Sequence, residues 1–512
     1  MKSWPFVEAQ RILTAHPDKS SFVFATGFGA SGTPHLGSFS ENVRSAAVRR
    51  ALTELRPDVE ARLVVFSDDY DAFRRVPDNF PKTMGADLGL PLSKVRDPIV
   101  GAGERYANFA ARNNAAMVRF LDTLDIDYQF ISATEMYQGG AFNDALLRVL
   151  RNYDAIMDVM LPTLGEERRG TYCPLLPVDP NTGRILQIPM VDHNVDTGEI
   201  VFRREDGSEF TTTVFDGNVK NSWKIDWAMR WGVLGVDYEM SGKDLIDSVK
   251  ASSKIARILG HQPPVSMTYE LFLDAEGRKI SKSLGNGVSV EEWLEYGTRE
   301  SLTQFMFQNP RAAKSIHLGL IPAVTDEYLK NLSRINNVQV AGSPESLDNP
   351  AWHIHQGDPP AWSSDVSYGL LINLASVSNA TDPDVLREYL ATYRDIADED
   401  RPIIDELLPR VIRYCERFVY PNKVVRDATE HERTALADLV FSLEALGEGL
   451  SGEDYQFEVY EIGKVHYGKE RLREWFTAIY EIIFGSADGP RFGTFIAAYG
   501  QRRSIDLIRS RI

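Results

Sequence analysis

The chain of 512 residues is 43% hydrophobic and 25% charged, values typical of a globular protein that is too long for one hydrophobic core. No run approaches the roughly 18 apolar residues of a membrane span, and residues 1–13 lack the apolar stretch of a signal peptide. Two cysteines, Cys173 and Cys415, are too few for a disulfide framework. We therefore expect a cytoplasmic protein of roughly two to four domains, with no membrane partner.

Acidic residues outnumber basic residues, 73 to 56, and give a net charge of −17. Taken alone, this excess argues against a nucleic-acid partner. Basic residues nevertheless cluster locally, for example at Arg410, Arg413 and Arg417. Because a large enzyme can gather such clusters on one face, the net charge does not exclude an RNA partner.

The first strong pattern is a strand, a glycine-rich turn and a helix. Residues 20–25 (SSFVFA) are typical of a buried strand, and residues 39–55 space apolar side chains along one helix face. Between them, residues 26–38 (TGFGASGTPHLGS) hold four glycines and one proline. Their spacing fits neither G-x-G-x-x-G nor G-x-x-x-x-G-K-S/T. The pattern predicts a nucleotide-binding unit with another kind of phosphate loop.

Strands and helices then alternate along the chain. The predicted elements are a strand at 62–67, a helix at 106–124, a strand at 127–132 and a helix at 143–161. This alternation predicts an α/β fold with a doubly wound parallel sheet, in which ligands bind at the carboxyl ends of the strands. Three aspartates, Asp68, Asp69 and Asp71, follow the second strand. They either orient a cationic substrate, or cap the strand and pair with Arg74 and Arg75.

The pattern changes after residue 170. Residues 170–220 alternate β-rich runs with the turns NTG, DTG and EDG, which predicts a ribbon of antiparallel hairpins inserted into the α/β domain. From about residue 320 apolar residues recur at helical spacing, so the C-terminal part is predicted to be helical. The Pro-rich stretch 342–362 is predicted to be a long loop.

Two short stretches point to chemistry on phosphates. In PHLGS (34–38) a histidine and a glycine stand at a helix N-terminus, where backbone N–H groups and the helix dipole favour phosphate oxygens. In KISKSLGNG (279–287) two lysines three positions apart could clamp a triphosphate, and tighten as charge builds on a leaving pyrophosphate.

Together these stretches resemble the two signatures of class I aminoacyl-tRNA synthetases. Longer stretches, among them FSDDYDAFRRVPDN, WAMRWGVLGVDYEMSGKD and GPRFGTFIAAYG, are similar to class I lysyl-tRNA synthetases from Trp4 to about Gly500. The resemblance implies a Rossmann-like catalytic domain at 1–320, with an inserted segment at about 105–220 and a signature-loop region at 265–320. It also implies a helical anticodon-binding domain at 321–512.

The resemblance implies a two-step reaction. Lysine attacks the α-phosphate of ATP to give lysyl-adenylate and pyrophosphate, and the lysyl group then passes to the 3′ end of the tRNA. The implied partners are L-lysine, ATP with Mg²⁺ and the tRNA for lysine, without DNA. No side chain need act as a covalent nucleophile, because positioning and charge stabilisation accelerate such reactions.

The resemblance also assigns residues. His35, Lys279 and Lys282 would be catalytic. The expected ATP site comprises Ala30, Ser31, Gly32, Pro34, His35, Leu36, Gly37, Ser38, Gly242, Asp244, Ile280, Ser281, Lys282 and Ser283. Gly27, Asp68, Asp69, Trp231 and Tyr269 are expected at the amino acid. The expected tRNA contacts are Arg410, Arg413, Arg417, Lys423 and Arg426, beside Tyr414 and Tyr420, because unpaired bases need positive charge and stacking partners.

The sequence departs from the family pattern in the inserted ribbon and after the Gly-Lys-Asp motif. The ribbon has Cys173 and His193 where many members carry cysteine pairs, so we expect no zinc site. Leu245 stands where the family usually has histidine, and in this it is similar to glutamyl- and glutaminyl-tRNA synthetases. Two alternatives therefore stay open. One is a paralogue that charges another amino acid or acceptor, and the other is a catalytically impaired tRNA-binding regulator.

Overall fold

The computed structural model describes residues 1–34, 36–99, 106–278, 280, 287–378, 380–391, 394–447, 449–487 and 491–512. The signature residues His35, Lys279, Ser281, Lys282 and Ser283 lie outside the described residues. The chain forms two compact units. The first comprises Met1–Val290 and Met306–His317, and the second comprises Glu291–Phe305 and Leu318–Ile512.

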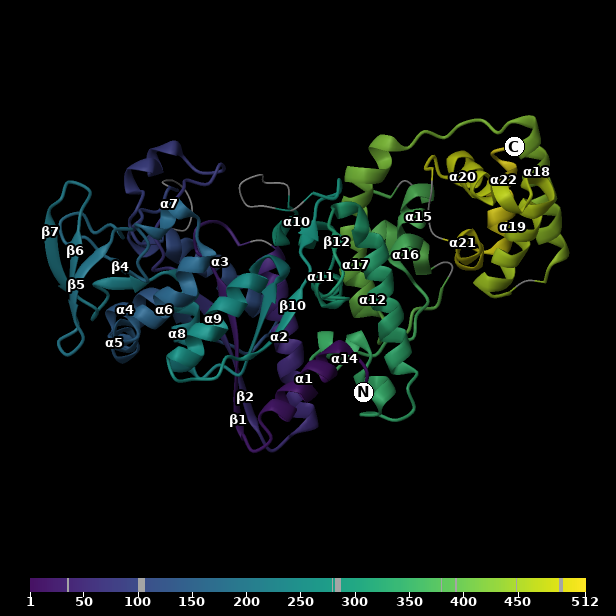
Figure 1. Ribbon diagram of the computed structural model, residues 1–512. Helices are drawn as coiled ribbons and strands as arrows, with labels where there is room; N and C mark the ends of the chain where they lie inside the picture. Colours follow the sequence, from purple (N-terminus) through teal and green to yellow (C-terminus); the bar gives the residue numbers. More distant parts are fainter. Residues whose placement is uncertain are drawn as a thin grey trace. The chain divides into compact units, whose positions relative to one another are not determined.

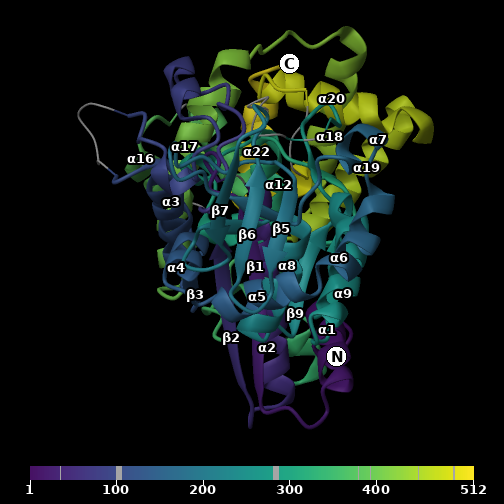
Figure 2. The same cartoon turned by 60° about the vertical axis from the view of Figure 1, so that its left-hand side comes forward.

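A five-stranded parallel sheet forms the centre of the first unit, with the strands in the order β10-β9-β1-β2-β3 (Figures 1 and 2). The strands are β1 (Ser21–Phe28), β2 (Glu60–Ser67), β3 (Gln129–Ser132), β9 (Tyr238–Gly242) and β10 (Val265–Tyr269). From β1 the chain proceeds to β2 and β3 on one side, whereas β9 and β10 lie on the other. The predicted doubly wound α/β fold is confirmed. A ligand site is expected where the strand order reverses, between β1 and β9.

Helices cover both faces of this sheet. Figure 1 shows α1 (Trp4–Ala15) and α2 (Leu36–Leu55) on one side and α8 (Trp223–Leu234) and α9 (Ile246–Ile258) on the other. The predicted helix at 106–124 is α3 (Phe109–Thr123), capped by the Asn108 side chain. The predicted helix at 143–161 is divided at Asn152. Its two parts are α5 (Asn143–Arg151) and α6 (Tyr153–Met160).

The ribbon predicted at 170–220 is confirmed as antiparallel. It contains a three-stranded sheet of β5 (Met190–Asn194), β6 (Glu199–Arg203) and β7 (Glu209–Thr213). Gly198 and Gly207 in its turns have φ of 73° and 84°, the left-handed region that glycine enters without steric cost. Beside this sheet β4 (Leu175–Pro177) pairs with β8 (Val219–Asn221). The remaining short elements of the first unit are α4 (Ala133–Gln138), α7 (Glu166–Arg169), β11 (Phe272–Leu273) and β12 (Lys314–Ser315).

The second unit is helical, as predicted for the chain from about residue 320 onward. Its helices are α10 (Val290–Tyr296), α11 (Arg299–Phe307), α12 (Ile321–Asn336), α13 (Pro344–Leu347), α14 (Pro350–Ile354), α15 (Tyr368–Ser378), α16 (Pro383–Ala391), α17 (Arg401–Tyr414), α18 (Glu430–Ala445), α19 (Gly452–Tyr467), α20 (Leu472–Ile483), α21 (Phe492–Tyr499) and α22 (Gln501–Arg509). The prediction of one long loop at 342–362 was wrong, because α13 and α14 lie within it. Among the described residues, no helix is both long and apolar enough to cross a bilayer.

Candidate active site

A cavity of about 630 Å³ lies at the carboxyl ends of β1, β2 and β9, where the strand order reverses. Its walls come from four segments distant in sequence. The lining residues are Gly27, Phe28, Gly29, Ser31, Glu41, Asp68, Asp71, Ala72, Arg74, Arg75, Pro77, Leu92, Trp223, Asp226, Trp227, Arg230, Glu239, Met240 and Leu245. Five of them carry carboxylates, namely Glu41, Asp68, Asp71, Asp226 and Glu239. The cavity therefore holds more carboxyl groups than arginines, of which it has three, Arg74, Arg75 and Arg230.

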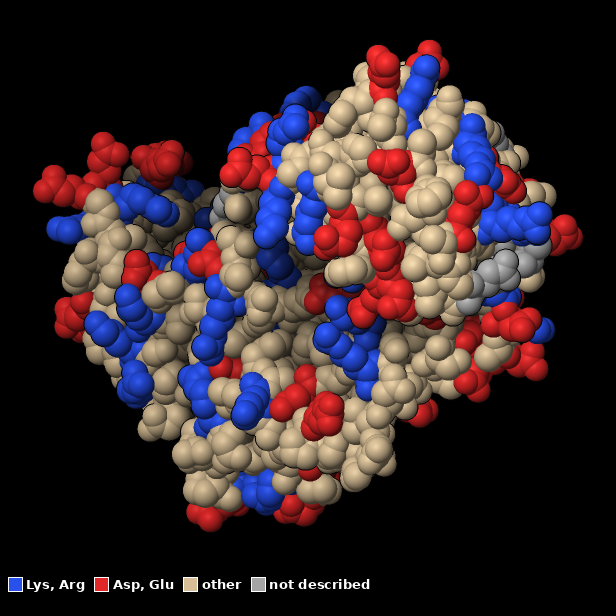
Figure 3. Space-filling view, turned by 90° about the vertical axis from the view of Figure 1, so that its right-hand side faces the viewer, with Lys and Arg blue, Asp and Glu red and all other residues tan. Residues whose placement is uncertain are grey.

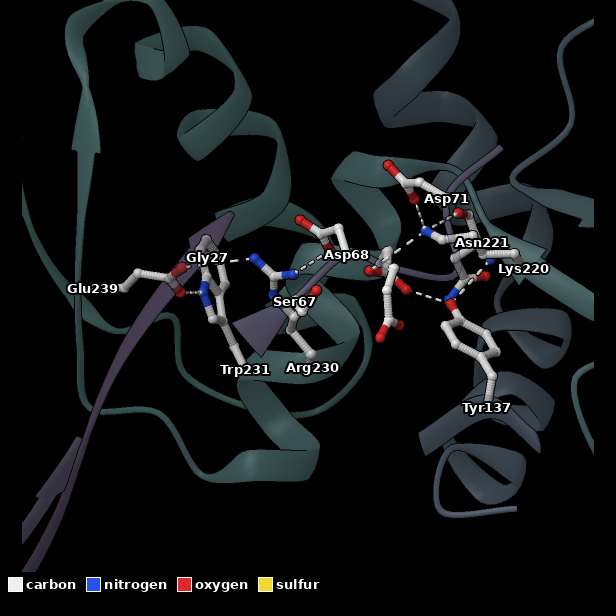
Figure 4. A network of polar contacts seen from close by, with 12 residues as sticks. Gly27, Ser67, Asp68, Asp71, Tyr137, Lys220, Asn221, Arg230, Trp231 and Glu239 are labelled. Carbon is white, nitrogen blue, oxygen red and sulfur yellow. Dashed lines mark hydrogen bonds and ion pairs between the residues drawn. The ribbon is translucent and has the colours of Figure 1, made fainter. Parts of the chain in front are cut away.

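Arg230 is the buried cation at the centre of this wall (Figure 4). Its Nη1 lies 2.8 Å from Oδ1 of Asp68, and its Nη2 lies 3.7 Å from Oε1 of Glu239. The guanidinium carbon is 4.5 Å from the centre of the Phe66 ring. Burial raises the pKa of Asp68 to about 7, although Arg230 acts in the opposite direction. Arg230 thus joins residues of β9 and the end of β2 across the intervening strand β1.

Lys220, on β8, is the second buried cation of the network (Figure 4). Its Nζ lies 2.6 Å from Oδ1 of Asp71 and 3.7 Å from Oδ2 of Asp226. The Tyr137 hydroxyl donates to Asp226 and accepts a hydrogen bond of 3.1 Å from the backbone N–H of Asn221. These contacts connect the end of the inserted ribbon with the acidic wall of the cavity.

Glu41 is a candidate residue that sequence reasoning missed. It lies near the start of α2, where its Oε2 accepts a hydrogen bond of 2.6 Å from the Tyr269 hydroxyl. Its Oε1 lies 3.4 Å from the backbone N–H of Gly27. Burial raises the pKa of Glu41 to about 8, more than these hydrogen bonds lower it. A carboxyl group held in this way can bind a cation once it has lost its proton. In the sequence, the only indication that Glu41 belongs to the site is its position about one helical turn after the glycine-rich loop.

The residues predicted at the amino acid divide into two groups. Gly27 and Asp68 line the cavity, and Tyr269 touches it through Glu41. Asp69 instead accepts hydrogen bonds from Ser132 Oγ at 2.6 Å and from Thr134 N at 2.8 Å, so it caps the sheet edge. The indole of Trp231 lies in the core and donates to Glu239 at 2.5 Å. The aromatic residues that line the cavity are Phe28, Trp223 and Trp227.

The predicted pairing of the aspartates with Arg74 and Arg75 differs from the structure. Asp68 pairs with Arg230 and Asp71 pairs with Lys220, both of which are far away in sequence. Arg75 pairs with Asp78 at 3.2 Å. Local sequence therefore suggested the wrong partners, because the opposite charges come from α8 and β8.

The described residues of the expected ATP site follow β1 and β9 in the chain, except Ile280, which lies beside β11. The turn before α2 is fixed by Thr26, whose hydroxyl donates to Asn42 at 2.7 Å, while Asn42 donates to the Ser38 carbonyl at 2.9 Å. Ala30, Gly32, Pro34 and Leu36 are buried, Gly37 is half-buried, and Ser31 faces the cavity. Gly242 ends β9, and Asp244 follows in a short 3₁₀ turn. Ile280, half-buried, is the only described residue of 279–283.

A Cβ built on Gly242 would lie 2.7 Å from Oδ1 of Asp244 and 3.1 Å from the Leu271 side chain. A side chain at position 242 would therefore have to displace the Asp244 carboxylate, and glycine allows β9 to approach it closely. Leu245, the departure from the family pattern, lines the cavity directly after this turn.

Most of the predicted tRNA contacts have partners within the second unit. Arg410 Nε donates to the Gly297 carbonyl and Arg413 Nε to the Glu295 carbonyl, each at 2.9 Å. Lys423 donates to the Ser376 carbonyl at 2.5 Å, and Arg426 pairs with Glu432 and Glu481. Arg417 is exposed. On the face in Figure 3, basic and acidic side chains are interspersed, and neither sign covers it alone.

The two ribbon residues considered as zinc ligands lie in different surroundings. Cys173 is buried, and burial raises the pKa of its thiol to about 12. The His193 ring lies 5.9 Å from the Tyr153 ring on an exposed part of β5. Within the described ranges, no group of three or more His, Cys, Asp or Glu side chains is placed to hold a metal ion.

Comparison with known proteins identifies the family. A sequence model of "tRNA synthetases class I (K)" matches residues 2–358. The chain is 45% identical to the lysine--tRNA ligase of Roseobacter denitrificans, covering 99% of this chain and 96% of that protein. It is 40% identical to the lysine--tRNA ligase of Rickettsia bellii, in an alignment that covers 100% of this chain and 98% of that protein. Among solved structures, methionyl-tRNA synthetase of Mycobacterium tuberculosis bound by methionyl-adenylate aligns at 15% identity with a TM-score of 0.39. The alignment covers 94% of this chain and 96% of that chain. The match over most of the chain, together with relatives of this identity along its full length, means that the chain belongs to the lysine-type class I tRNA synthetases.

Proposed function

We propose that the protein attaches L-lysine to its tRNA in two steps and consumes ATP. In the first step the lysine carboxylate attacks the α-phosphate of ATP, which forms lysyl-adenylate and releases pyrophosphate. In the second, a hydroxyl of the 3′-terminal ribose attacks the lysyl carbonyl, and AMP leaves. The observation that carries this proposal is the acidic cavity at the reversal of strand order, in a chain whose relatives are lysine--tRNA ligases.

The cavity suits a long cationic side chain. Its five carboxyl groups outnumber the three arginines that line it, so an added ammonium group is favoured electrostatically once Glu41 and Asp68 have lost their protons. We assign the lysine ε-ammonium to Glu41, which already accepts hydrogen bonds from Tyr269 and Gly27. The apolar faces of Trp223, Trp227, Met240 and Leu245 can pack against the methylene groups.

The nucleotide is assigned to the other end of the site. His35, Lys279 and Lys282 are proposed to stabilise the charge on the phosphates, with Mg²⁺ bound to ATP, while Gly242 and Asp244 hold the ribose.

No zinc is proposed for the ribbon. The two free cysteines, both buried, suit a reducing compartment, and we place the enzyme in the cytoplasm.

The second unit is proposed to bind the anticodon. Four of the five predicted basic residues make contacts within that unit, which leaves Arg417 as the strongest candidate. Because residues 291–305 group with the second unit, a truncation near residue 320 would divide it, and point variants are a sharper test. Arg417→Ala should raise the KM for tRNA and leave the KM for lysine unchanged. Arg417→Lys, which keeps the charge, should have a smaller effect.

One measurement separates this function from its alternatives. Exchange of pyrophosphate into ATP is followed with each of the twenty amino acids, in the presence of tRNA. Exchange with lysine alone supports the proposal. Leu245 in the cavity wall favours, as second candidate, a paralogue that charges another amino acid, and exchange with glutamate or glutamine in place of lysine would establish it. Tight tRNA binding without any exchange would indicate the regulator.

A further inference from the structure

The opening of the cavity differs in charge from its interior. In the interior, Glu239 and the cation Arg230 are buried and the acidic residue Glu41 is half-buried. Two consecutive arginines, Arg74 and Arg75, also line the cavity, but both are exposed. The Arg75 side chain is 66% exposed. The cavity therefore has an acidic interior and a basic rim.

The rim guanidinium groups are accessible to a ligand. The partner of Arg75, Asp78, is itself 51% exposed, and their contact of 3.2 Å is of a kind that contributes little stability. Arg74 lies beside it in the irregular segment that follows β2. Neither side chain is needed to neutralise the buried carboxylates, because Arg230 and Lys220 are paired with those.

The two arginines lie apart from the residues proposed to hold the ribose, although Ser31 of the expected ATP site lines the same cavity. Gly242 and Asp244 follow β9, whereas Arg74 and Arg75 follow β2, and β1 lies between these strands. A second source of phosphate must nevertheless reach this cavity. If lysyl transfer occurs here, the 3′-terminal ribose of the tRNA has to enter, and each nucleotide behind it carries a phosphodiester charge.

Electrostatics determines where these phosphates can lie. Carboxylates in the interior repel a phosphodiester, so only the ribose and its base can pass inward, and the backbone must stay at the rim. Arginine binds phosphate oxygens through two parallel N–H donors. We propose that Arg74 and Arg75 bind the phosphodiester backbone of the unpaired 3′ nucleotides of the tRNA. This inference rests on the proposed function and extends it to the docking of the acceptor end.

The test uses the full-length protein with both arginines replaced, Arg74→Ala/Arg75→Ala. The matched control is Arg56→Ala/Arg62→Ala, which removes the half-exposed Arg56 and the exposed Arg62 near the amino end of β2, and with them the same charge. Binding of the tRNA is measured directly, without catalysis, at several salt concentrations. KM values for lysine and ATP are measured at saturating tRNA.

The rim variant should bind tRNA at least about 10-fold more weakly, because each charge-assisted hydrogen bond that is lost reduces affinity by about 10- to 150-fold. The slope of log Kd against log salt should fall by about 1.4, that is about 0.7 for each single-strand phosphate. A tRNA that lacks its unpaired 3′ nucleotides should bind the variant and the parent protein equally. The control variant should bind both tRNAs as the parent does.

Three results would overturn the inference. The first is a raised KM for ATP with unchanged tRNA affinity, which would assign the arginines to the ATP phosphates. The second is an equal loss of affinity in the control variant, and the third is an equal loss for the shortened tRNA. Failure of the proposed function is distinguishable, because the parent protein would then bind tRNA but transfer no lysine to it.

Discussion

The guanidinium of Arg230 occupies the space that a side chain at position 27 would need: a Cβ built on Gly27 would lie 2.8 Å from Nη2 of Arg230. Arg230 cannot simply move away, since it is buried and paired with Asp68 and Glu239. The absence of a side chain at position 27 thus allows the guanidinium to cross β1 and join the strands on either side.

Gly27→Ala should therefore displace Arg230 from its carboxylate partners. Overpacking against a buried side chain such as that of Arg230 costs about 1–3 kcal/mol of the free energy of unfolding. The KM for lysine should rise as well, because the acidic wall loses its geometry. Chemical unfolding and lysine-dependent exchange measure the two effects. Gly29→Ala is the control, since the nearest atom to a Cβ there is Ser31 Oγ at 3.7 Å. Equal effects of the two substitutions would argue against the packing explanation.

The pKa of Glu41, about 8, predicts opposite pH dependences for lysine affinity and for stability. The lysine cation favours the ionised carboxylate, so affinity for lysine should rise with pH up to about 8, by at most about tenfold per unit for one proton. The folded pKa lies above the unfolded value of 4.5, so the native state retains a proton that the unfolded chain releases. The free energy of unfolding should therefore fall as pH rises from 4.5 to about 8.

Glu41→Gln removes this titration and keeps an acceptor for the Tyr269 hydroxyl. The variant should be more stable than the parent at pH 8 and should bind lysine more weakly at that pH. Calorimetric titration and thermal melting at several pH values check both expectations. A variant that binds lysine as well as the parent at pH 8 would rule out Glu41 as the partner of the ε-ammonium.

The signature residues should act on the transition state and not on folding. Lys282→Ala should remove positive charge that the pyrophosphate needs only as it leaves, which reduces the rate about 100-fold. His35→Ala should have an effect of similar size. Both variants should melt near the temperature of the parent protein. Full lysine-dependent exchange by either variant would show that the assignment of the ATP site is wrong.

Leu245 predicts weak affinity for lysine. Leucine offers no hydrogen bond at a position in the cavity wall where histidine could donate one. A hydrogen bond to a charged ligand contributes about 1.5–3 kcal/mol, or roughly 10- to 150-fold in affinity. Leu245→His should lower the KM for lysine by a factor in this range. An unchanged KM would show that the side chain at 245 does not touch the amino acid.

The ribbon should fold without metal. Cys173 and His193 are too few ligands for a closed tetrahedral zinc site. Elemental analysis of protein purified without chelator should find less than about one-tenth of an equivalent of zinc, given that shortage of ligands. Stoichiometric zinc would mean that other residues complete a site.

The sheet and its helices were predictable because their signals are local. β1 and β2 are apolar runs, and the turns of the ribbon carry glycine where φ is positive. Serine or asparagine followed by proline, at Ser343 and Asn349, also marks a helix start, and attention to this pattern would have revealed α13 and α14.

The partners within the site were not predictable, because they are set by tertiary packing. Glu41 meets Tyr269 across 228 positions, and Arg230 meets Asp68 across 162. Trp227 and Trp231 are one helical turn apart on α8, yet only Trp227 lines the cavity. Helical spacing identifies a face, but the residue that borders an opening depends on what packs against that face.

The pairing of β1 with β9 has a consequence for synthesis of the protein. Val23 N–H donates to the Asp237 carboxylate, 214 positions later in the chain. A ribosome adds about 5–20 residues per second. One edge of β1 therefore stays unpaired for about 10 to 40 s before β9 is synthesised. During this interval the apolar run FVFA has an unpaired edge, a template for aggregation that the finished sheet removes. Newly made chains should therefore be substrates for a chaperone that binds extended apolar segments, until β9 has left the ribosome.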